Sequence, residues 1–382
     1  MSQRLSFIFC FLMCAALGNA QYEISELGQM PQETFETSGL IFIDGKAITH
    51  NDSGNNALLF EIDTTTVQIT RTVAVSNAEN VDWEDIAHDE EFIYIGDFGN
   101  NNGNRQDLRV YRISKQDYIA METVTAEQIN FSYEDQVDFV AEANSDWDAE
   151  ALFVLGDELI VLTKQWKNNG TVAYSFPKTP GTYVANKLDG YGNIGLVTGA
   201  DYDQETNVLS IVGYSQTLSP FVMLVEDLSS TGIFEGKIEK TTLDIGFAQT
   251  EGIVQIEPHR FLLSCEYFSN ETPSITSEAR LFSLKIDDTV VAEEPETPGQ
   301  PTENETDQLI LYREVGSTTL NYQLNTNKRV LSMAIFDATG SIIRQEKQVD
   351  LTSVIDLLTM SSSIYYLTFY LEGTTLSRPF VR

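Results

Sequence analysis

Acidic residues recur at the start of short apolar strands in this sequence, and they are the residues best suited to chemistry. Four of them occupy matching positions along the chain: Glu84, Glu150, Asp201 and Glu251. If the fold brings them together, their charges repel, and a cation, a proton or hydrogen-bond donors must offset the repulsion. Oxygen-only ligands suit Ca²⁺ or Mg²⁺. We predict a metal site at these four carboxylates, with Ca²⁺ as the candidate cofactor; in the alternative, each acid caps the backbone N–H groups of its own turn.

Two further residues join these acids in the predicted ligand-binding set. Asp85 follows Glu84 directly, and His50 precedes the Asn51-Asp52 turn, where it is a candidate general base. With three histidines in the chain, a histidine-rich zinc cluster is excluded unless carboxylates complete it. A lone histidine is more often a hydrogen-bonded structural residue. No sequence motif identifies a catalytic residue.

The acidic positions belong to an internal repeat. Residues 38–56 align with residues 83–101, which pairs Gly39 with Glu84 and Asp52 with Asp97. Each copy continues into a strand of alternating apolar residues, and three more divergent copies begin near residues 150, 201 and 251. Repeats of about 45 residues with several short strands are typical of β-propeller blades.

The repeat predicts an all-β fold, with a β-propeller of five blades over residues 21–286. Six blades are the alternative, because the spacing between the acids at residues 84 and 150 is longer than one repeat. Residues 126–133 are expected to form the fourth strand of blade two. Residues 22–27 are expected to add the outer strand of the last blade, which would close the ring and remove the unpaired strand edges that invite aggregation.

Residues 1–20 have the features of a signal peptide. They contain a basic residue, Arg4, an apolar run from Leu5 to Leu17, and a small-residue cleavage site before Gln21. The run is shorter than the roughly 20 residues that span a bilayer, and no other apolar run is long enough. Without this segment Cys265 is the single cysteine, so no intramolecular disulfide is expected, and its alternation with apolar residues predicts a buried position.

The formal charge of -34 is concentrated in the predicted propeller, where residues 21–286 hold 43 acidic and 15 basic residues. A body this anionic argues against nucleic acid and anionic lipid as partners. Two explanations fit the charge, namely solubility in a saline exterior and binding of divalent cations. The charge by itself does not separate them.

A change of composition marks the end of the propeller. Residues 287–307 are acidic, contain three prolines and no aromatic residue, and are predicted to form an extended linker. Residues 308–382 alternate again, with one hairpin predicted over 332–343 and another over 364–382. About 75 residues of strands predict a small C-terminal β-sandwich.

The C-terminal region resembles the type A sorting domain of the Bacteroidetes type IX secretion system. The likeness lies in the Ile335-Phe336-Asp337-x-x-Gly340 turn, the strand Ser363 to Leu367 and the terminal basic-x-Phe-Val-basic strand. The sequence departs from the family at Ser363, where glycine is usual. The resemblance implies that the secretion machinery is a partner, and that the protein is released or held on the outer-membrane surface after export to the periplasm. A carbohydrate-binding or adhesion sandwich is the alternative.

The propeller is similar, more loosely, to secreted phytase-like and gluconolactonase-like propellers, through its blade pattern and acids such as Glu251. That resemblance implies a divalent metal at the channel mouth. A polyphosphate substrate fits poorly, because few basic residues are present to bind it. Two functions follow as hypotheses: a secreted propeller that binds an unidentified ligand without turnover, or a metal-dependent hydrolase of the lactonase, esterase or phosphodiester type.

Overall fold

The computed structural model describes residues 22–228, 232–271, 274–286, 307–313, 318–337, 342–347, 349–357, 360, 364–371 and 374–382. Strands form nearly all of its regular structure, as the alternating apolar pattern predicts. The predicted signal peptide and residues 287–306 of the predicted linker lie outside the described residues. Within the described part, no helix has the length and apolar character needed to cross a membrane.

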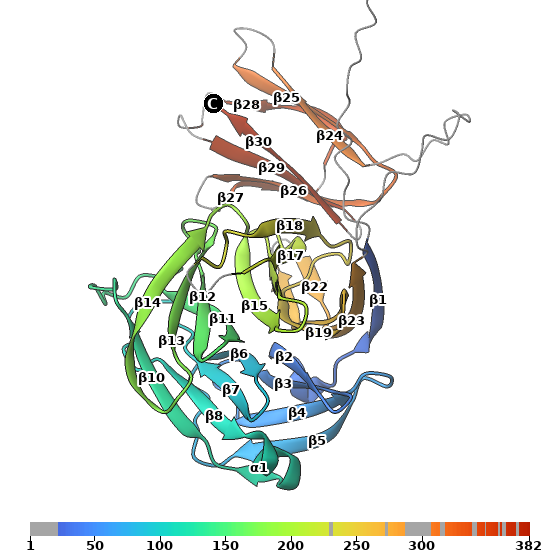
Figure 1. The fold of residues 1–382 in the computed structure, drawn as a ribbon. Coiled ribbons are helices and arrows are strands. Elements are labelled where there is room, and N and C mark those ends of the chain that lie inside the picture. The colour runs from blue at the N-terminus through green and yellow to red at the C-terminus, as the bar shows by residue number, and fades with distance from the viewer. Residues whose placement is uncertain are drawn as a thin grey trace, which may run out of the picture.

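Five blades surround a central channel (Figure 1). Blade one comprises β2 (Thr37–Ile43), β3 (Lys46–Asn51), β4 (Leu58–Asp63), β5 (Gln68–Val75) and the short parallel β9 (Thr123–Val124). Blade two comprises β6 (Trp83–His88), β7 (Phe92–Asp97), β8 (Arg109–Ser114) and β10 (Glu127–Tyr133). Blade three comprises β11 (Asp148–Leu155), β12 (Glu158–Lys164), β13 (Thr171–Pro177) and β14 (Gly181–Tyr191). Blade four comprises β15 (Leu196–Asp203), β16 (Val208–Tyr214), β17 (Pro220–Glu226) and β18 (Lys237–Thr242).

Blade five closes the ring. It combines β19 (Thr250–Glu257), β20 (Arg260–Cys265) and β23 (Arg280–Ile286) with the first strand of the chain, β1 (Tyr22–Gln29). The antiparallel pairing of β1 with β23 confirms the predicted closure. The predicted fourth strand of blade two is also confirmed, since β10 pairs with β8, and the described residues form no sixth blade. A short hairpin, β21 (Phe268–Glu271) and β22 (Ser274–Ser277), is inserted between β20 and β23. Two short helices, η1 (Gln32–Thr34) and α1 (Lys115–Ala120), complete the propeller.

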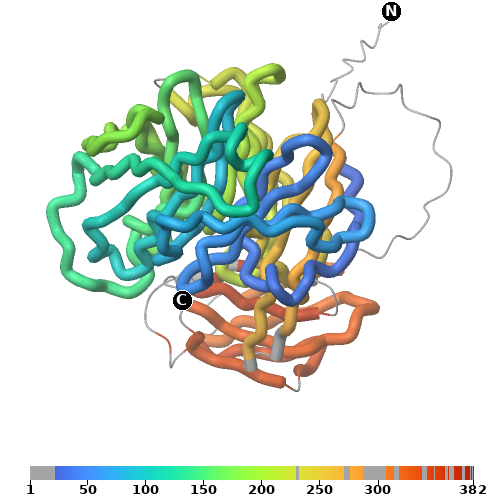
Figure 2. The backbone as a smooth tube through the Cα atoms, turned by 90° about the horizontal axis from the view of Figure 1, so that it is seen from below, coloured from blue at the N-terminus to red at the C-terminus, as the bar shows by residue number. Residues whose placement is uncertain are grey.

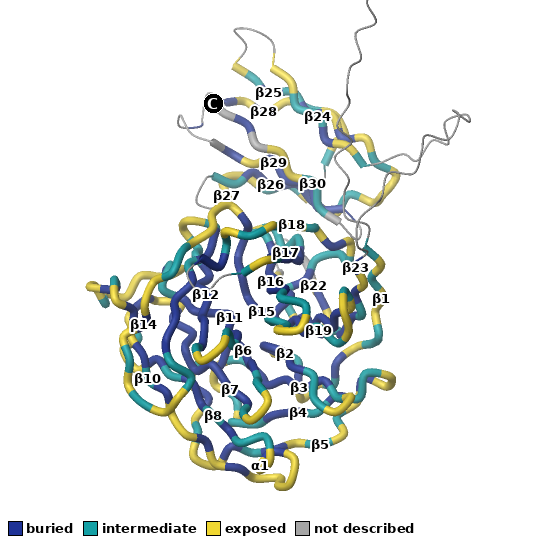
Figure 3. The backbone as a smooth tube through the Cα atoms, viewed as in Figure 1, coloured by how far each residue is buried: buried dark blue, intermediate teal, exposed yellow. Residues whose placement is uncertain are grey.

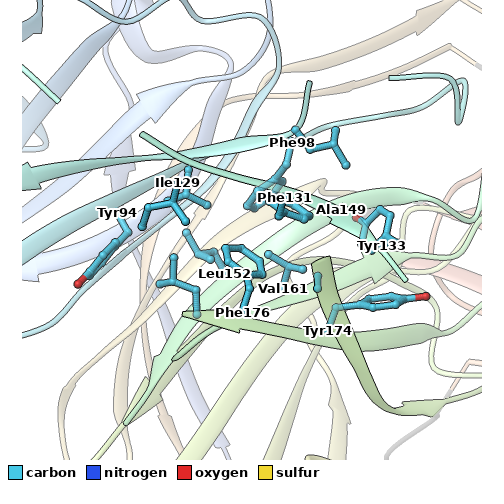
Figure 4. Close-up of a cluster of buried hydrophobic side chains, with 14 of the residues drawn as sticks. Tyr94, Phe98, Ile129, Phe131, Tyr133, Ala149, Leu152, Val161, Tyr174 and Phe176 are labelled. Atoms are coloured by element: carbon cyan, nitrogen blue, oxygen red, sulfur yellow. The ribbon is translucent and has the colours of Figure 1, made fainter. Parts of the chain in front are cut away.

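The hydrophobic core lies between neighbouring blades. Figure 3 shows the inner strands buried along most of their length. Between blades two and three, Phe131 stacks on Phe176 with ring centroids 4.4 Å apart, and Tyr133 lies 4.5 Å from Tyr174 (Figure 4). Blade two is further joined to blade three by parallel pairing of β10 with β14. Trp83 is fully buried between blades one and two.

The inner strands share a bulge near the channel mouth. In β6, β11, β15 and β19 the strand register shifts by one residue, at Glu84, Glu150, Thr198 and Glu251 respectively. A bulge places one extra residue against its partner strand and turns that side chain away from its ordinary direction. The bulge therefore decides which side chain each blade presents to the channel.

The C-terminal region forms a sandwich of two sheets (Figure 1). One sheet contains β24 (Gln308–Tyr312), β25 (Thr319–Asn325) and β28 (Thr352–Asp356), and the other contains β26 (Val330–Asp337), β27 (Ile342–Glu346), β29 (Ile364–Leu371) and β30 (Thr374–Val381). The two predicted hairpins are confirmed, because β26 pairs with β27 and β29 with β30. Residues 338–340 of the predicted turn and Ser363 lie outside the described residues.

Candidate cation site at the channel mouth

A pocket of about 200 Å³ opens where the bulged ends of the inner strands meet the loops of one propeller face. Three of the four predicted metal ligands line it: Glu84 from β6, Glu150 from β11 and Glu251 from β19. Ser38 of β2 lines the side that belongs to blade one, where its hydroxyl donates to the Glu84 carbonyl. The structure thus brings acids from three blades together, as the repeat predicts.

Carboxylate oxygens approach one another closely on both sides of Glu84. On one side, one oxygen each from Glu84, Asp148 and Glu150 lies within 4.8 Å of the others. On the other side, the same holds for Glu84, Asp52 and Asp82. Oxygen atoms at such spacing can ligate one hard cation together, and Glu84 belongs to both groups.

The Glu84 carboxylate is buried in this pocket without a donor. Its residue is only 5% exposed, and none of the described residues donates a hydrogen bond to its carboxylate. Burial, followed by the charge of Glu150, raises the pKa of Glu84 well above its usual value. Gly99 leaves room for this side chain, because a Cβ there would overlap a Glu84 oxygen and the Asp82 carboxylate. Glu84 lines the pocket, where a proton or a cation can offset its charge.

One ammonium group counters part of the negative charge. The Nζ of Lys164, at the end of β12, lies 3.1 Å from Oε1 of Glu150 and faces the rings of Trp166 and Tyr214 at 4.9 and 5.5 Å. Burial opposes the charge of Lys164, but the neighbouring carboxylates, Glu150 first, raise its pKa well above the usual value. Five carboxylates line the pocket with this single lysine: Asp52, Glu84, Glu150, Glu251 and Glu266.

Backbone and aromatic donors orient the surrounding acids. The Asp148 carboxylate accepts hydrogen bonds from the Asn100 backbone N–H at 2.6 Å and from the Trp166 indole N–H at 3.0 Å. The Gln249 amide donates to the Tyr214 hydroxyl at 3.1 Å and to Glu266 at 2.7 Å. The predicted alternative, in which each anchor acid caps its own turn, does not describe Glu84, and the donors that hold these neighbouring acids come from other segments of the chain.

Asp201, the fourth predicted ligand, does not line the pocket. In β15 the bulge falls at Thr198, three residues earlier, so Thr198 occupies the place of the anchor acid. Asp201 lies further along the strand, where its carboxylate accepts the Gln255 backbone N–H at 2.8 Å. The repeat in the sequence aligns Asp201 with the other acids, whereas the strand register places Thr198 at the equivalent position.

The predicted ligand roles of Asp85 and His50 are also not supported by their positions. Asp85 lies deeper in the channel, where its carboxylate accepts backbone N–H groups from Ile86 at 2.8 Å, Leu152 at 2.7 Å and Ala200 at 3.2 Å. His50 is fully buried against Trp83, and burial lowers its pKa to about 4. Neither residue lines the pocket, and a histidine that stays neutral above pH 5 is a structural residue in this setting.

Three charged residues of the pocket are absent from the predicted ligand set: Asp52, Lys164 and Glu266. They share one position, since each lies at the end of the second strand of its blade or one residue beyond it. The repeat contains the signal that would have found them. The residue that ends each second strand lies beside the bulge of the first.

Comparisons with known proteins find solved structures of similar fold but no matching protein family. No protein-family profile matches the chain, and no curated protein matches it significantly in sequence. Similar solved structures include the PQQ-bound aldose sugar dehydrogenase of Streptomyces coelicolor (10% identity, TM-score 0.41, covering 70% of this chain and 99% of that chain) and a DUF4623 family protein of Bacteroides eggerthii (11%, 0.40, 81% and 74%). A putative glucose dehydrogenase of Thermus thermophilus gives 9% identity, a TM-score of 0.39, and coverage of 69% and 100%. With TM-scores below 0.5, these likenesses carry no argument about activity.

The acids of the mouth should make stability depend on pH when no cation is bound. Burial raises the pKa of Asp82 and Glu251 to about 7 and that of Glu266 to about 9. Between the unfolded carboxyl pKa of about 4 and these values, the folded state holds protons that the unfolded chain has released, so stability falls as pH rises. Urea unfolding in EDTA should show lower stability at pH 8 than at pH 5. A rise in stability over this range would contradict the assignment.

Proposed function

We propose that this propeller binds a divalent cation, with Ca²⁺ preferred, in the pocket at its channel mouth, and presents the bound cation to an extracellular ligand. One observation carries the proposal: the buried Glu84 carboxylate has no donor among the described residues and lies between two groups of carboxylate oxygens. A cation would provide the missing partner.

The donor set favours a hard cation. The two carboxylate groups around Glu84 contain oxygen ligands alone, and none of the three histidines lines the pocket. Ca²⁺ accepts six to eight oxygens in flexible geometry, which suits carboxylates that come from separate blades. The near-octahedral geometry that Mg²⁺ demands suits such a set less well.

Calcium should raise the melting temperature of the protein, and EDTA should lower it. At a Ca²⁺ concentration about 100-fold above Kd, the gain of about 2.7 kcal/mol corresponds to a shift of roughly 5 °C or more. Glu84→Gln keeps the shape of the side chain, and it should abolish this response because the ligand shared by both carboxylate groups loses its charge. Differential scanning calorimetry with and without Ca²⁺ measures the shift.

Glu205→Gln is the matched control, since Glu205 lies on an exposed turn away from the pocket. The control should respond to Ca²⁺ as the unaltered protein does. A melting temperature that ignores both Ca²⁺ and EDTA in the unaltered protein would refute the proposal, and so would a full response in Glu84→Gln.

A metal-dependent hydrolase is the second candidate, and Glu251 is the observation that favours it. This glutamate lines the same pocket, and burial raises its pKa to about 7, the range in which a carboxyl group can exchange protons during catalysis. A cation held by Glu84 would polarise a bound carbonyl or phosphoryl oxygen. Cation-dependent hydrolysis of an ester or lactone that is lost in Glu251→Gln, with the Ca²⁺ response retained, would favour turnover over binding.

We further propose that the chain is exported by its signal peptide and crosses the outer membrane through the type IX secretion system. The support is the signal-like segment at residues 1–20 and the C-terminal motifs, two of which lie on the paired strands β29 and β30. A weak Ca²⁺ site would suit an extracellular location, because extracellular Ca²⁺-binding modules have Kd values of about 10⁻⁴–10⁻³ M.

Deletion of residues 308–382 should leave a folded propeller in the periplasm that is not exported further. The propeller closes through its own strands β1 and β23, so we expect it to fold without the sandwich. Cell fractionation with immunoblotting measures the location, and circular dichroism of the recovered protein checks its fold. Unchanged secretion of the deleted form would refute the sorting role.

A further inference from the structure

The C-terminal sandwich contacts the propeller through an aromatic cluster. Phe247, in the connection between β18 and β19, and Phe268, at the start of β21, form what we call the aromatic shelf. Both pack against Ala334 and Tyr370 of the sandwich, as does Phe336 from the sandwich itself, and the Phe247 and Tyr370 ring centroids lie 5.5 Å apart. Tyr370 is only 4% exposed, although it lies on the outer face of its sheet. Figure 2 shows the sandwich against one side of the propeller.

The shelf belongs to the same two segments that form one wall of the cation pocket. Phe247 lies two residues before Gln249, and Phe268 lies two residues after Glu266. Gln249 and Glu266 both line the pocket, and the 2.7 Å hydrogen bond between them joins the two segments. A contact that holds the shelf residues in place therefore also restrains this wall of the pocket.

Backbone hydrogen bonds hold the base of this wall: the Glu266 N–H donates to the Gln249 carbonyl at 3.1 Å, and the Ala248 N–H donates to the Leu218 carbonyl at 3.2 Å. Glu266 lies beyond the end of β20, so strand pairing with β23 stops one residue before it. Its neighbour Tyr267 is held by a 2.7 Å backbone hydrogen bond to Phe35 and by ring stacking on it at 5.4 Å. The sandwich adds a contact at the next residue, Phe268.

We propose that the C-terminal sandwich docks on the aromatic shelf of its own chain and thereby holds the Gln249–Glu266 wall of the cation pocket in place. Twenty-one residues connect Ile286 to Gln308, which keeps the sandwich at high local concentration beside the shelf. The two surfaces match in kind, because both contribute aromatic rings that pack together. The effect on cation affinity rests on the proposed function, whereas the docking does not.

The test compares the mature full-length protein with Phe247→Ser/Phe268→Ser. In EDTA, small-angle X-ray scattering should show a larger radius of gyration for the variant, and hydrogen exchange of residues 247–250 and 265–269 should accelerate about tenfold. In Ca²⁺ titrations by calorimetry, Kd should rise about fivefold. Tyr312→Ser/Val354→Ser is the matched control, since both residues are exposed on the other sheet of the sandwich, and it should change none of these quantities.

Each outcome is decisive. A variant that stays compact overturns docking on the shelf, and an expanded variant with unchanged exchange at the wall overturns the positioning role. A dimer that exchanges sandwiches, seen by light scattering, overturns docking within one chain. Absence of Ca²⁺ binding in the unaltered protein refutes the proposed function. The docking is still tested in that case, by X-ray scattering and hydrogen exchange in EDTA. Tyr370→Ser tests the same contact from the sandwich side if the double variant does not fold.

Discussion

Replacing Asp85 by alanine should lower the free energy of unfolding of the propeller by about 3 kcal/mol or more. The Asp85 carboxylate accepts backbone N–H groups of Ile86, Leu152 and Ala200, which belong to blades two, three and four. Alanine leaves these buried donors without an acceptor, and each unsatisfied buried group costs about 1–3 kcal/mol. Urea unfolding followed by tryptophan fluorescence measures the loss.

Asp157→Ala is the control for this variant, because Asp157 lies on an exposed turn and the change there should stay within about 0.5 kcal/mol. Asp85→Asn should fall between the two, since its amide oxygen can still accept part of the set. A loss below about 1 kcal/mol in Asp85→Ala would show that the three blades do not depend on this carboxylate.

The architecture was predictable because it depends on local pattern. Alternating apolar residues mark most of the strands, and the repeat of about 45 residues groups them into blades. Closure by β1 was predictable for the same reason, since residues 22–27 alternate and precede the first complete blade. These features require knowledge of which residues form strands, and they do not depend on where any single side chain points.

The site was predictable only in part, because it depends on register. A shift of one residue turns a strand's side chains to its other face, so the bulge position decides which residue enters the channel. Glu84, Glu150 and Glu251 coincide with bulges, whereas Asp201 lies three residues beyond the bulge at Thr198. No local preference marks a threonine as the equivalent of three glutamates.

Long-range partners explain the remaining differences. The Asp85 carboxylate accepts hydrogen bonds from the backbone N–H groups of Leu152 and Ala200, which are 67 and 115 residues away in the chain. Lys164 ends an apolar strand, a place where a lysine usually faces water, and only the assembled ring surrounds it with carboxylates. Roles of this kind arise from the closure of the ring, and for Lys164 the mark in the sequence is its place at the end of the second strand of its blade.

Replacing Lys164 by methionine should destabilise the propeller by about 3 kcal/mol at pH 8 in EDTA. The change removes one partner of a buried ion pair and leaves Glu150 uncompensated, which typically costs about 3–5 kcal/mol. The loss should shrink toward pH 5, because burial raises the pKa of Glu150 well above its usual value and a proton can then replace the lysine charge. Lys237→Met, at an exposed ion pair, is the control and should change stability by less than about 1 kcal/mol.

Calcium makes this variant a test of the whole site. If the cation binds between Glu84, Asp148 and Glu150, it supplies positive charge to the same carboxylate that lost Lys164, so Ca²⁺ should recover part of the stability. The melting temperature of Lys164→Met should therefore rise more with Ca²⁺ than that of the unaltered protein. A smaller rise would mean that Lys164 helps to build the cation site, and an equal rise would place the cation away from Glu150, on the side of Asp52 and Asp82.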